Sequence, residues 1–512
     1  MVKSLTDLAA TVGKWLLVLV FLTLPLNTLR PVGEIALADF LIPALFLISF
    51  LLFVTRASVR RKVFLLPRWF WIGSAILVLS IGLIELFPAP DPGRLVAAFD
   101  NYGVQESLSI VVGSRLILAL AVFPVVVGLL VDRWTTVRLL VNAWIIGVTV
   151  SCAVAVLDAY FGFGLQKFFA YDPDTIANYL SAAPGDPARH VGLTDHPNTL
   201  SLTTVMVSPL VMAKMTSRQG LIRYAPVLAL MVLAVAASGT RTGLIVIAIG
   251  AVLTLAFDRG VRQAFSSLST RTVVAGISII LVVAVLIGLA GAAPPESEVG
   301  KRVPASLSRI FNEDGVSSAY ANNEREAWIE DSIDFISERP VLGHGFQWVE
   351  ASHNTVLQLL LSGGVIALVG FALVIGGYLK LGFGLRSVIP EDLETTSVAL
   401  AISLILYLIS GITTNHIFER YLYIPAGLIL ALYMLHLTRP EGNPAAQESH
   451  SRDEPSASST LLDRLRMIAR VVALASPPAR TAVAIPVVDG GVARIRKPTM
   501  KTVRFSTSVS DP

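Results

Sequence analysis

Long apolar runs, separated by short polar segments, recur along nearly the whole chain. A run of about 20 apolar residues crosses the roughly 30 Å hydrocarbon core of a bilayer as an α-helix. These runs are continuous, whereas β-barrel strands alternate polar and apolar positions. The pattern therefore predicts an all-α, polytopic transmembrane helical bundle. It has about 12 spans, at residues 12–29, 35–55, 70–88, 111–131, 137–160, 198–213, 224–239, 242–257, 272–292, 354–378, 396–414 and 421–437.

Composition agrees with this class and excludes several others. Hydrophobic residues make up 54% of the chain and charged residues 15%, so a soluble domain is excluded. The single cysteine, Cys152, excludes an intramolecular disulfide and a cysteine-based metal site. The first run has no small-residue cleavage site after it, which favours a membrane helix over a signal peptide. A phosphate-binding P-loop is also missing, so we do not expect ATP to be the energy source.

The distribution of Lys and Arg between loops predicts the orientation. Alternate short loops together hold fifteen Lys or Arg, whereas those on the opposite side hold only Arg30, Arg94, Arg241 and Arg420. Because basic loops stay in the cytoplasm, both termini are expected there. Residues 161–197, the tight turn 238–243 and residues 292–352 then lie on the outer face.

Two domains are expected: a membrane domain, 1–440, and a cytoplasmic tail, 441–512, that is largely disordered. Part of the tail, 461–474, could form a basic amphipathic helix on the inner leaflet. Within the long outer loop 292–352, apolar residues recur at helical spacing over 323–338 and predict an amphipathic helix near the membrane surface. The apolar residues are Trp328, Ile329, Ile333 and Ile336. Arg339-Pro340 should end this helix, and Gly343 and Gly345 should turn the chain back to the bilayer.

Two arginines at water–membrane junctions are candidates for anion binding. Arg189 precedes the sixth span, and Arg241 lies in the SGTRTG turn between the seventh and eighth. A guanidinium is a fixed fork of donors that suits phosphate oxygens, and helix N-termini favour anions as well. The alternatives are an arginine that snorkels to headgroups for Arg189 and an acidic partner from a neighbouring span for Arg241. Arg115, near the outer end of the fourth span, is a further candidate.

His353 begins the tenth span and is a candidate general base, because imidazole titrates near neutral pH. The alternative is a histidine that bonds backbone at a helix start. Asn354 could orient the ring or bind sugar, and His416 is expected on the same outer face. His344 and His196 compete for the role of base, and we interpret His196, which precedes a proline at a helix entry, as structural or supporting. The outer face lacks a carboxylate pair or a His/Cys cluster at ligand spacing, so neither a metal nor another cofactor is expected.

These motifs together resemble the O-antigen ligase family of bacterial membrane enzymes. The resemblance covers roughly residues 180–380 and rests on R-x-x-G-x-x-x-HPN at 189–198, SGTRTG at 238–243, and the NNEREAW, PVLGHGF and SHNTVLQLLLSGG segments within 322–364. It implies a metal-independent glycosyltransferase of the GT-C type. Arg189 and Arg241 would hold the donor pyrophosphate, and His353 would help to activate the acceptor hydroxyl. Arg325 and Trp328 match the family's loop helix, where they could contact glycan or simply lie on the surface.

The resemblance also implies the partners and the location. The donor would be an undecaprenyl-pyrophosphate glycan, and the acceptor either lipid A core, for a ligase, or a growing glycan, for a repeat-unit polymerase. The enzyme would lie among the lipids of the bacterial inner membrane with its active site in the periplasm, and no nucleic acid partner is implied. A polyisoprenoid-glycan transporter is the competing class. It should carry charges at mid-membrane depth, whereas the notable charges here gather at one face.

Overall fold

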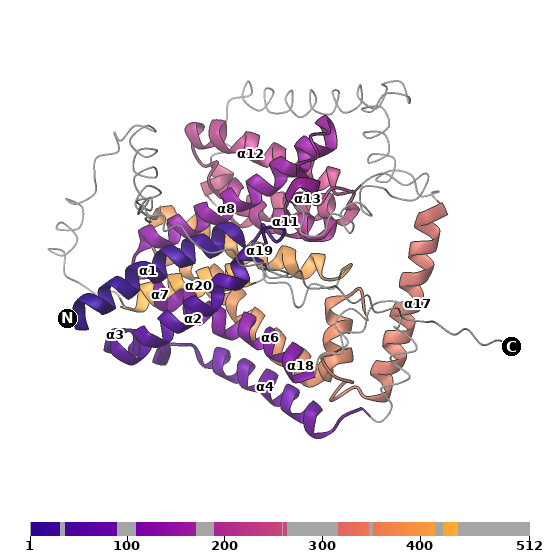
Figure 1. The fold of residues 1–512 in the computed structure, drawn as a ribbon, viewed down its shortest axis with the longest axis horizontal. Coiled ribbons are helices and arrows are strands. Elements are labelled where there is room, and N and C mark those ends of the chain that lie inside the picture. The colour runs from indigo at the N-terminus through magenta and orange to yellow at the C-terminus, as the bar shows by residue number, and fades with distance from the viewer. Residues whose placement is uncertain are drawn as a thin grey trace, which may run out of the picture. The chain divides into compact units, whose positions relative to one another are not determined.

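The structure is a computed structural model. It describes residues 2–30, 36–89, 109–169, 189–258, 260–263, 316–347, 352–414 and 423–438. Every regular element in these ranges is a helix (Figure 1). The helices are α1 (Val2–Thr23), α2 (Leu37–Thr55), α3 (Ala57–Phe64), α4 (Arg68–Leu86), α6 (Ser109–Ile117), η2 (Leu118–Val122), α7 (Phe123–Leu130), α8 (Trp134–Val156), η3 (Leu157–Phe161), α9 (Leu165–Phe169), α11 (Pro197–Ala213), α12 (Arg218–Ala237), α13 (Arg241–Phe257), α17 (Val316–Glu338), α18 (Thr355–Gly384), η4 (Leu385–Ser387), α19 (Glu391–Ser410) and α20 (Tyr423–Thr438).

The predicted fold class is confirmed. Among the described residues, 8 helices are long and apolar enough to cross a membrane, and two shorter apolar helices are Thr242–Phe257 and Tyr423–Thr438. Each predicted run coincides with a helix, except 272–292, which lies outside the described residues.

Some predicted boundaries were wrong. α1 spans Val2–Thr23 rather than 12–29, because polar helix-forming residues extend it towards the N-terminus and Pro25 follows its end. The run predicted at 354–378 belongs to α18, which continues to Gly384 and is kinked at Gly364.

Small residues let the membrane helices approach one another closely. α4 and α18 lie side by side (Figure 1) and cross at Gly73 and Gly370. A Cβ atom built on either glycine would lie 3.1 Å from the carbonyl oxygen of the other. Close backbone approach of this kind replaces the hydrophobic driving force that helices lack inside a lipid bilayer.

α11 lies inside the bundle, with α8, α12, α13 and α19 packed around it. Every residue of α11 except Asn198 is buried. Three of its hydroxyls, those of Thr203, Thr204 and Ser208, donate to carbonyl oxygens of the preceding turn. The N-terminus of α11 therefore presents His196 and Asn198 to the interior of the protein rather than to lipid.

The kink in α18 accommodates the turn that follows α17. Gly364 has φ 62° and ψ −164°, a conformation accessible essentially to glycine alone. Val365 N donates to Pro340 O over 2.9 Å, and His344 N donates to Leu361 O over 2.7 Å. The turn with positive φ at Gly343 and Gly345, which the sequence predicts, is thus bonded to α18 on both sides of its kink.

The predicted helix at 323–338 is confirmed as part of the longer α17. α17 packs beside α18, and its more buried face carries Trp328, Ser332 and Phe335 at helical spacing. Ile329 and Ile333 are 38% and 51% exposed. The outward apolar side chains fit a position at a membrane surface, which stays a prediction.

All described residues lie before residue 440. The boundary at 440, the disordered tail and its helix at 461–474 therefore stay predictions.

Candidate functional site

Arg189 joins two of the motifs singled out by the sequence. Its Nε donates to the carbonyl oxygen of Ser238 over 3.2 Å, and its Nη2 donates to Asn198 Oδ1 over 2.9 Å. The next residue, His190, donates its backbone N–H to Ala237 O over 3.1 Å. The guanidinium is therefore held between the SGTRTG turn and the N-terminus of α11.

The segment after Arg189 is fixed from one side by Gln166 on α9. Its Oε1 accepts the backbone N–H groups of Val191 and Gly192 over 2.6 and 2.9 Å. Since Oε1 is the acceptor, the amide nitrogen donates to His190 Nδ1, 2.7 Å away. Gly192 has φ +62°, and a Cβ there would lie 2.5 Å from the carbonyl oxygen of Ser151. Sequence reasoning missed Gln166, because no local pattern marks a glutamine that bonds the backbone of a distant segment.

The turn that follows α1 holds the same segment from another side. Asn27 Nδ2 donates to Asp195 Oδ2 over 3.2 Å. Thr28 donates both its backbone N–H and its hydroxyl to the carbonyl oxygen of Leu193, over 3.1 and 3.0 Å. Residues 189–196 are thus bound to the turn after α1, to α9 and to the end of α12, which lie far apart in the sequence. This attachment fixes where Arg189 and His196 stand.

His196 caps α11, with its Nδ1 accepting the backbone N–H of Asn198 over 3.0 Å. The pKa of His196 is lowered from 6.5 to about 4: burial is the largest cause, the charges of Arg189 and His353 act in the same direction, and the charge of Asp195 opposes them. The ring is therefore neutral at physiological pH, with its proton on Nε2. The charges of Arg189 and His353 therefore both act on the His196 ring.

His353 lies half-buried just before α18, beneath the indole of Trp328 on α17. The two ring centroids are 4.6 Å apart, and the ring planes meet at 39°. Asn354 caps α18, because its side-chain oxygen accepts from the backbone N–H groups of Val356 and Leu357. Its Nδ2 donates to Ile412 O over 3.0 Å. Trp328 and the cap together define where His353 sits.

The end of α19 connects His353 to the Arg241 turn. Thr355 N donates to Gly411 O over 2.7 Å, and two residues further on the hydroxyls of Thr413 and Thr242 are 3.3 Å apart. Arg241 itself begins α13, next to Thr242. The backbone segments that carry Arg189, Arg241 and His353 therefore adjoin one another.

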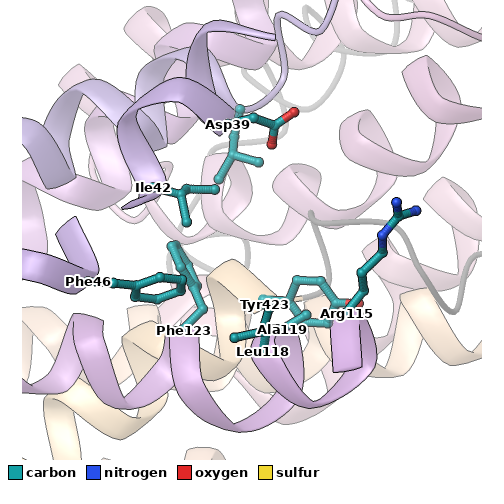
Figure 2. A pocket seen from close by; sticks show the side chains of 9 residues that line it. Asp39, Ile42, Phe46, Arg115, Leu118, Ala119, Phe123 and Tyr423 are labelled. Atoms are coloured by element: carbon teal, nitrogen blue, oxygen red, sulfur yellow. The ribbon is translucent and has the colours of Figure 1, made fainter. Parts of the chain in front are cut away.

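The remaining candidate residues either lie away from the adjoining segments that carry Arg189 and His353, or have side chains that the structure does not describe. Arg115 is exposed on α6 and lines a separate pocket (Figure 2). The side chains of Arg241 and Arg325 are not described, and His416 lies outside the described residues. His344 is buried, and its Nε2 lies 2.6 Å from the carbonyl oxygen of Phe335 on α17, to which it donates. Within the described ranges, no group of three or more His, Cys, Asp or Glu could hold a metal ion.

A bundle of apolar helices defines a polytopic helical membrane protein, and the guanidinium of Arg189 lies where α11 begins. Residues 226–372 match the family model described as O-antigen ligase. The resemblance of this part of the chain to the O-antigen ligase family is thus confirmed. The matched segment contains Arg241, Trp328 and His353, whereas Arg189 precedes it. A comparison with curated proteins finds no match.

Proposed function

We propose that the protein transfers a glycan from undecaprenyl pyrophosphate to an acceptor hydroxyl at the periplasmic face of the bacterial inner membrane. The observation that carries the proposal is the placement of Arg189. Its guanidinium bridges the SGTRTG turn and the start of α11, beside a neutral His196 that is coupled electrostatically to His353. A role in surface-polysaccharide biosynthesis follows from the O-antigen ligase domain.

Arg189 and Arg241 bind the donor pyrophosphate in this proposal. Arg189 is held by Ser238 and Asn198, so little conformational entropy is lost when it meets an anion. α11 and α13 begin next to the two arginines, and the positive ends of both helix dipoles add to the field there. This preorganised charge stabilises pyrophosphate as it leaves, and therefore supplies the main catalytic effect without a metal.

His353 acts as the general base. As the acceptor oxygen forms its bond to the anomeric carbon, the hydroxyl proton passes to the imidazole. The bond between the anomeric carbon and the pyrophosphate oxygen breaks, and its electron pair leaves with undecaprenyl pyrophosphate. The Trp328 indole, 4.6 Å from the His353 ring, restricts the side from which the acceptor can approach.

The acceptor is lipid A core if the protein is a ligase, and a growing lipid-linked glycan if it is a polymerase of the same family. The ligase is our first proposal, and a polyisoprenoid-glycan transporter is the remaining alternative. In each of these three proposals both termini lie in the cytoplasm, because the loops rich in Lys and Arg lie on the cytoplasmic side.

A reconstituted transfer assay tests the proposal. Purified protein receives undecaprenyl-pyrophosphate oligosaccharide in EDTA, with lipid A core in one tube and no second acceptor in the other. We expect product only with lipid A core, whereas a ladder of longer lipid-linked glycans would indicate a polymerase. Movement of the lipid between leaflets without any product would favour the transporter.

Variants assign the roles in the same assay. Arg241→Ala and His353→Ala should abolish transfer, and Arg241→Lys should restore little because an ammonium lacks the bidentate fork. Arg223→Ala is the matched control, since Arg223 is an exposed arginine at the opposite end of α12 from the SGTRTG turn. Normal transfer by Arg241→Ala would remove Arg241 from the site.

A further inference from the structure

Three exposed phenylalanines lie where α8 and η3 end and α9 follows. Phe161, Phe163 and Phe168 are 66%, 62% and 80% exposed, although phenylalanine is one of the residue types most often found buried. The rings of Phe161 and Phe163 stack, with their centroids 6.0 Å apart. We call these three residues the aromatic patch. Large apolar groups that gather on a surface mark a place of interaction.

The aromatic patch continues a stripe of apolar side chains along α8. Ile146 and Val150 are 53% and 43% exposed. Ala153 and Leu157, which are half-buried, follow at helical spacing and lead on to Phe161. On a membrane-spanning helix packed in a bundle, the exposed apolar face is the one that meets lipid. The aromatic patch therefore adjoins the lipid-facing surface of α8.

Distances along the helix place the aromatic patch at a boundary of the bilayer. At the other end of α8, Arg138 Nε pairs with Asp392 Oδ2 over 2.6 Å, and charged groups of this kind avoid the hydrocarbon. The helix rises about 35 Å from Arg138 to Phe161 at 1.5 Å per residue, slightly more than the hydrocarbon core of about 30 Å. The aromatic patch is thus at the level where acyl chains meet headgroups, on the outer side in the proposed orientation.

α9 is fixed at its start. Asp158 of η3 accepts the backbone N–H groups of Leu165 and Gln166 over 2.7 and 2.6 Å. The helix has 5 residues, little more than one turn, and a helix so short is not stable by itself. The position of its far end therefore depends on what its outer side chains contact.

The two faces of α9 have different neighbours. Gln166 is 1% exposed, and its Oε1 accepts the backbone N–H groups of Val191 and Gly192 in the segment that begins with Arg189. Phe168 is two residues further on, which is nearly the opposite side of a helix. A contact made by Phe168 on the outside therefore bears on the segment that Gln166 holds on the inside.

The chemistry of the aromatic patch favours lipid over sugar or protein. A phenylalanine ring is apolar throughout, whereas Tyr and Trp carry a polar group that suits a contact with sugar or water. Lys167 is exposed beside Phe168, and a lysine stem lies along apolar surface while its ammonium reaches the headgroups. Phenylalanine with a neighbouring lysine is typical of short segments that lie in a membrane interface.

We propose that Phe161, Phe163 and Phe168 insert among the phospholipids of the outer leaflet, at the boundary of headgroups and acyl chains. α9 is then a membrane anchor, and through Gln166 it holds residues 189–196 in place. The insertion itself is independent of the proposed function. Its consequence for glycan transfer rests on the proposed function, because it acts through Arg189.

Spin labels test the insertion. Cys152 is fully buried, so in full-length protein in phospholipid nanodiscs a nitroxide reagent attaches to one introduced cysteine. Phe163→Cys and Phe168→Cys label the aromatic patch. Val150→Cys is the reference in hydrocarbon, and Arg133→Cys is the reference in water, since its side chain is 77% exposed. We expect the labels at 163 and 168 to meet oxygen more often than a water-soluble nickel complex, as at 150. Accessibilities like those at 133 would overturn the proposal.

Hydrogen exchange tests whether the anchor holds the segment. Phe163→Ser/Phe168→Ser removes two rings that are 62% and 80% exposed, and the matched control Phe50→Ser/Phe64→Ser removes two that are 65% and 80% exposed. We expect only the first double variant to speed amide exchange in residues 189–196, by about ten-fold. Unchanged exchange in that variant would refute the coupling.

A conservative variant separates lipid from other occupants. Phe163→Leu/Phe168→Leu keeps the apolar side chains but removes the rings. Because leucine also enters lipid, we expect this variant to exchange like the wild type. Exchange as fast as in the serine double variant would mean that the rings are recognised as rings, by sugar or by a protein partner, and would contradict the anchor.

The transfer assay separates this inference from the proposed function. The kcat/KM of Phe163→Ser/Phe168→Ser should fall about ten-fold, since a displaced Arg189 meets the pyrophosphate in the wrong position. If the wild type transfers glycan and this variant does so equally well, the link from the anchor to Arg189 fails. If the labels insert and exchange responds as expected but the wild type transfers nothing, the anchor stands and the proposed function fails.

Discussion

Asn198→Ala tests whether Arg189 must be held in place in order to act. The substitution removes the Oδ1 atom that accepts from Arg189 Nη2 over 2.9 Å. It keeps the backbone N–H that donates to His196 Nδ1, so the cap of α11 survives. Arg189 keeps its bond to Ser238 O but can rotate about it. We therefore expect a loss of positioning without a loss of charge.

The expected fall in kcat/KM follows from the one hydrogen bond that is lost. A hydrogen bond to a charged group contributes about 1.5–3 kcal/mol. If that positioning is felt in the transition state, kcat/KM falls about 10- to 150-fold. Asn198→Asp should also lose activity, because its carboxylate would neutralise the guanidinium that phosphate needs.

The assay is donor-dependent transfer kinetics on protein that elutes as a single species in detergent. Thr203→Ala is the matched control, since it removes a hydroxyl of the same helix that bonds only within α11. We expect the control to retain wild-type kcat/KM. An Asn198→Ala enzyme within about two-fold of the wild type, below the effect of one charged hydrogen bond, would refute the reasoning.

Three further perturbations probe other parts of the structure. Trp328→Leu removes the ring whose centroid lies 4.6 Å from that of His353. We expect the kcat of transfer to fall about ten-fold and the pH dependence of kcat to shift, as measured by transfer kinetics over a range of pH. The pKa of His196 is about 4 when folded and 6.5 in its ordinary state, so the unfolded chain binds more protons between these values. Stability should therefore fall by up to about 3 kcal/mol as the pH drops from 6.5 to 4, and thermal unfolding of His196→Asn should lack most of this dependence. Gly364→Ala places a Cβ 2.1 Å from a carbonyl oxygen at a φ of +62°, so its melting temperature should drop markedly. Gly376→Ala, with nothing within 4 Å of its Cβ, should melt like the wild type.

Hydropathy predicted the helices well because the bilayer imposes both length and polarity on them. It placed α1 too late, since the first turns of that helix are polar and carry no hydropathy signal. The kink at Gly364 was not predicted either. It depends on the turn bonded against it, and Val365 N meets Pro340 O only in the folded protein.

The candidate site was partly predictable for a similar reason. Arg189 and Arg241 lie in short motifs that can be recognised from the local sequence alone. The helices that begin beside them were predicted from the apolar runs. Gln166 supports the site from α9, and Asn27 supports it from the turn after α1. Their roles depend on contacts between distant segments, which no local pattern records. The capping role of Asn354 is local and could be anticipated from its position before α18.

The burial of α11 bears on how the protein is made. α11 is only 17 residues long, and within the described residues it is not among the helices apolar and long enough to cross a membrane on their own. A segment of this kind partitions weakly into lipid during synthesis, so its insertion relies on α8, α12, α13 and α19, which surround it. Of these, α19 is the last to be translated. The helix that carries His196 and Asn198 can therefore settle only after the ribosome has passed residue 410, so truncated or interrupted chains should lack an assembled anion site.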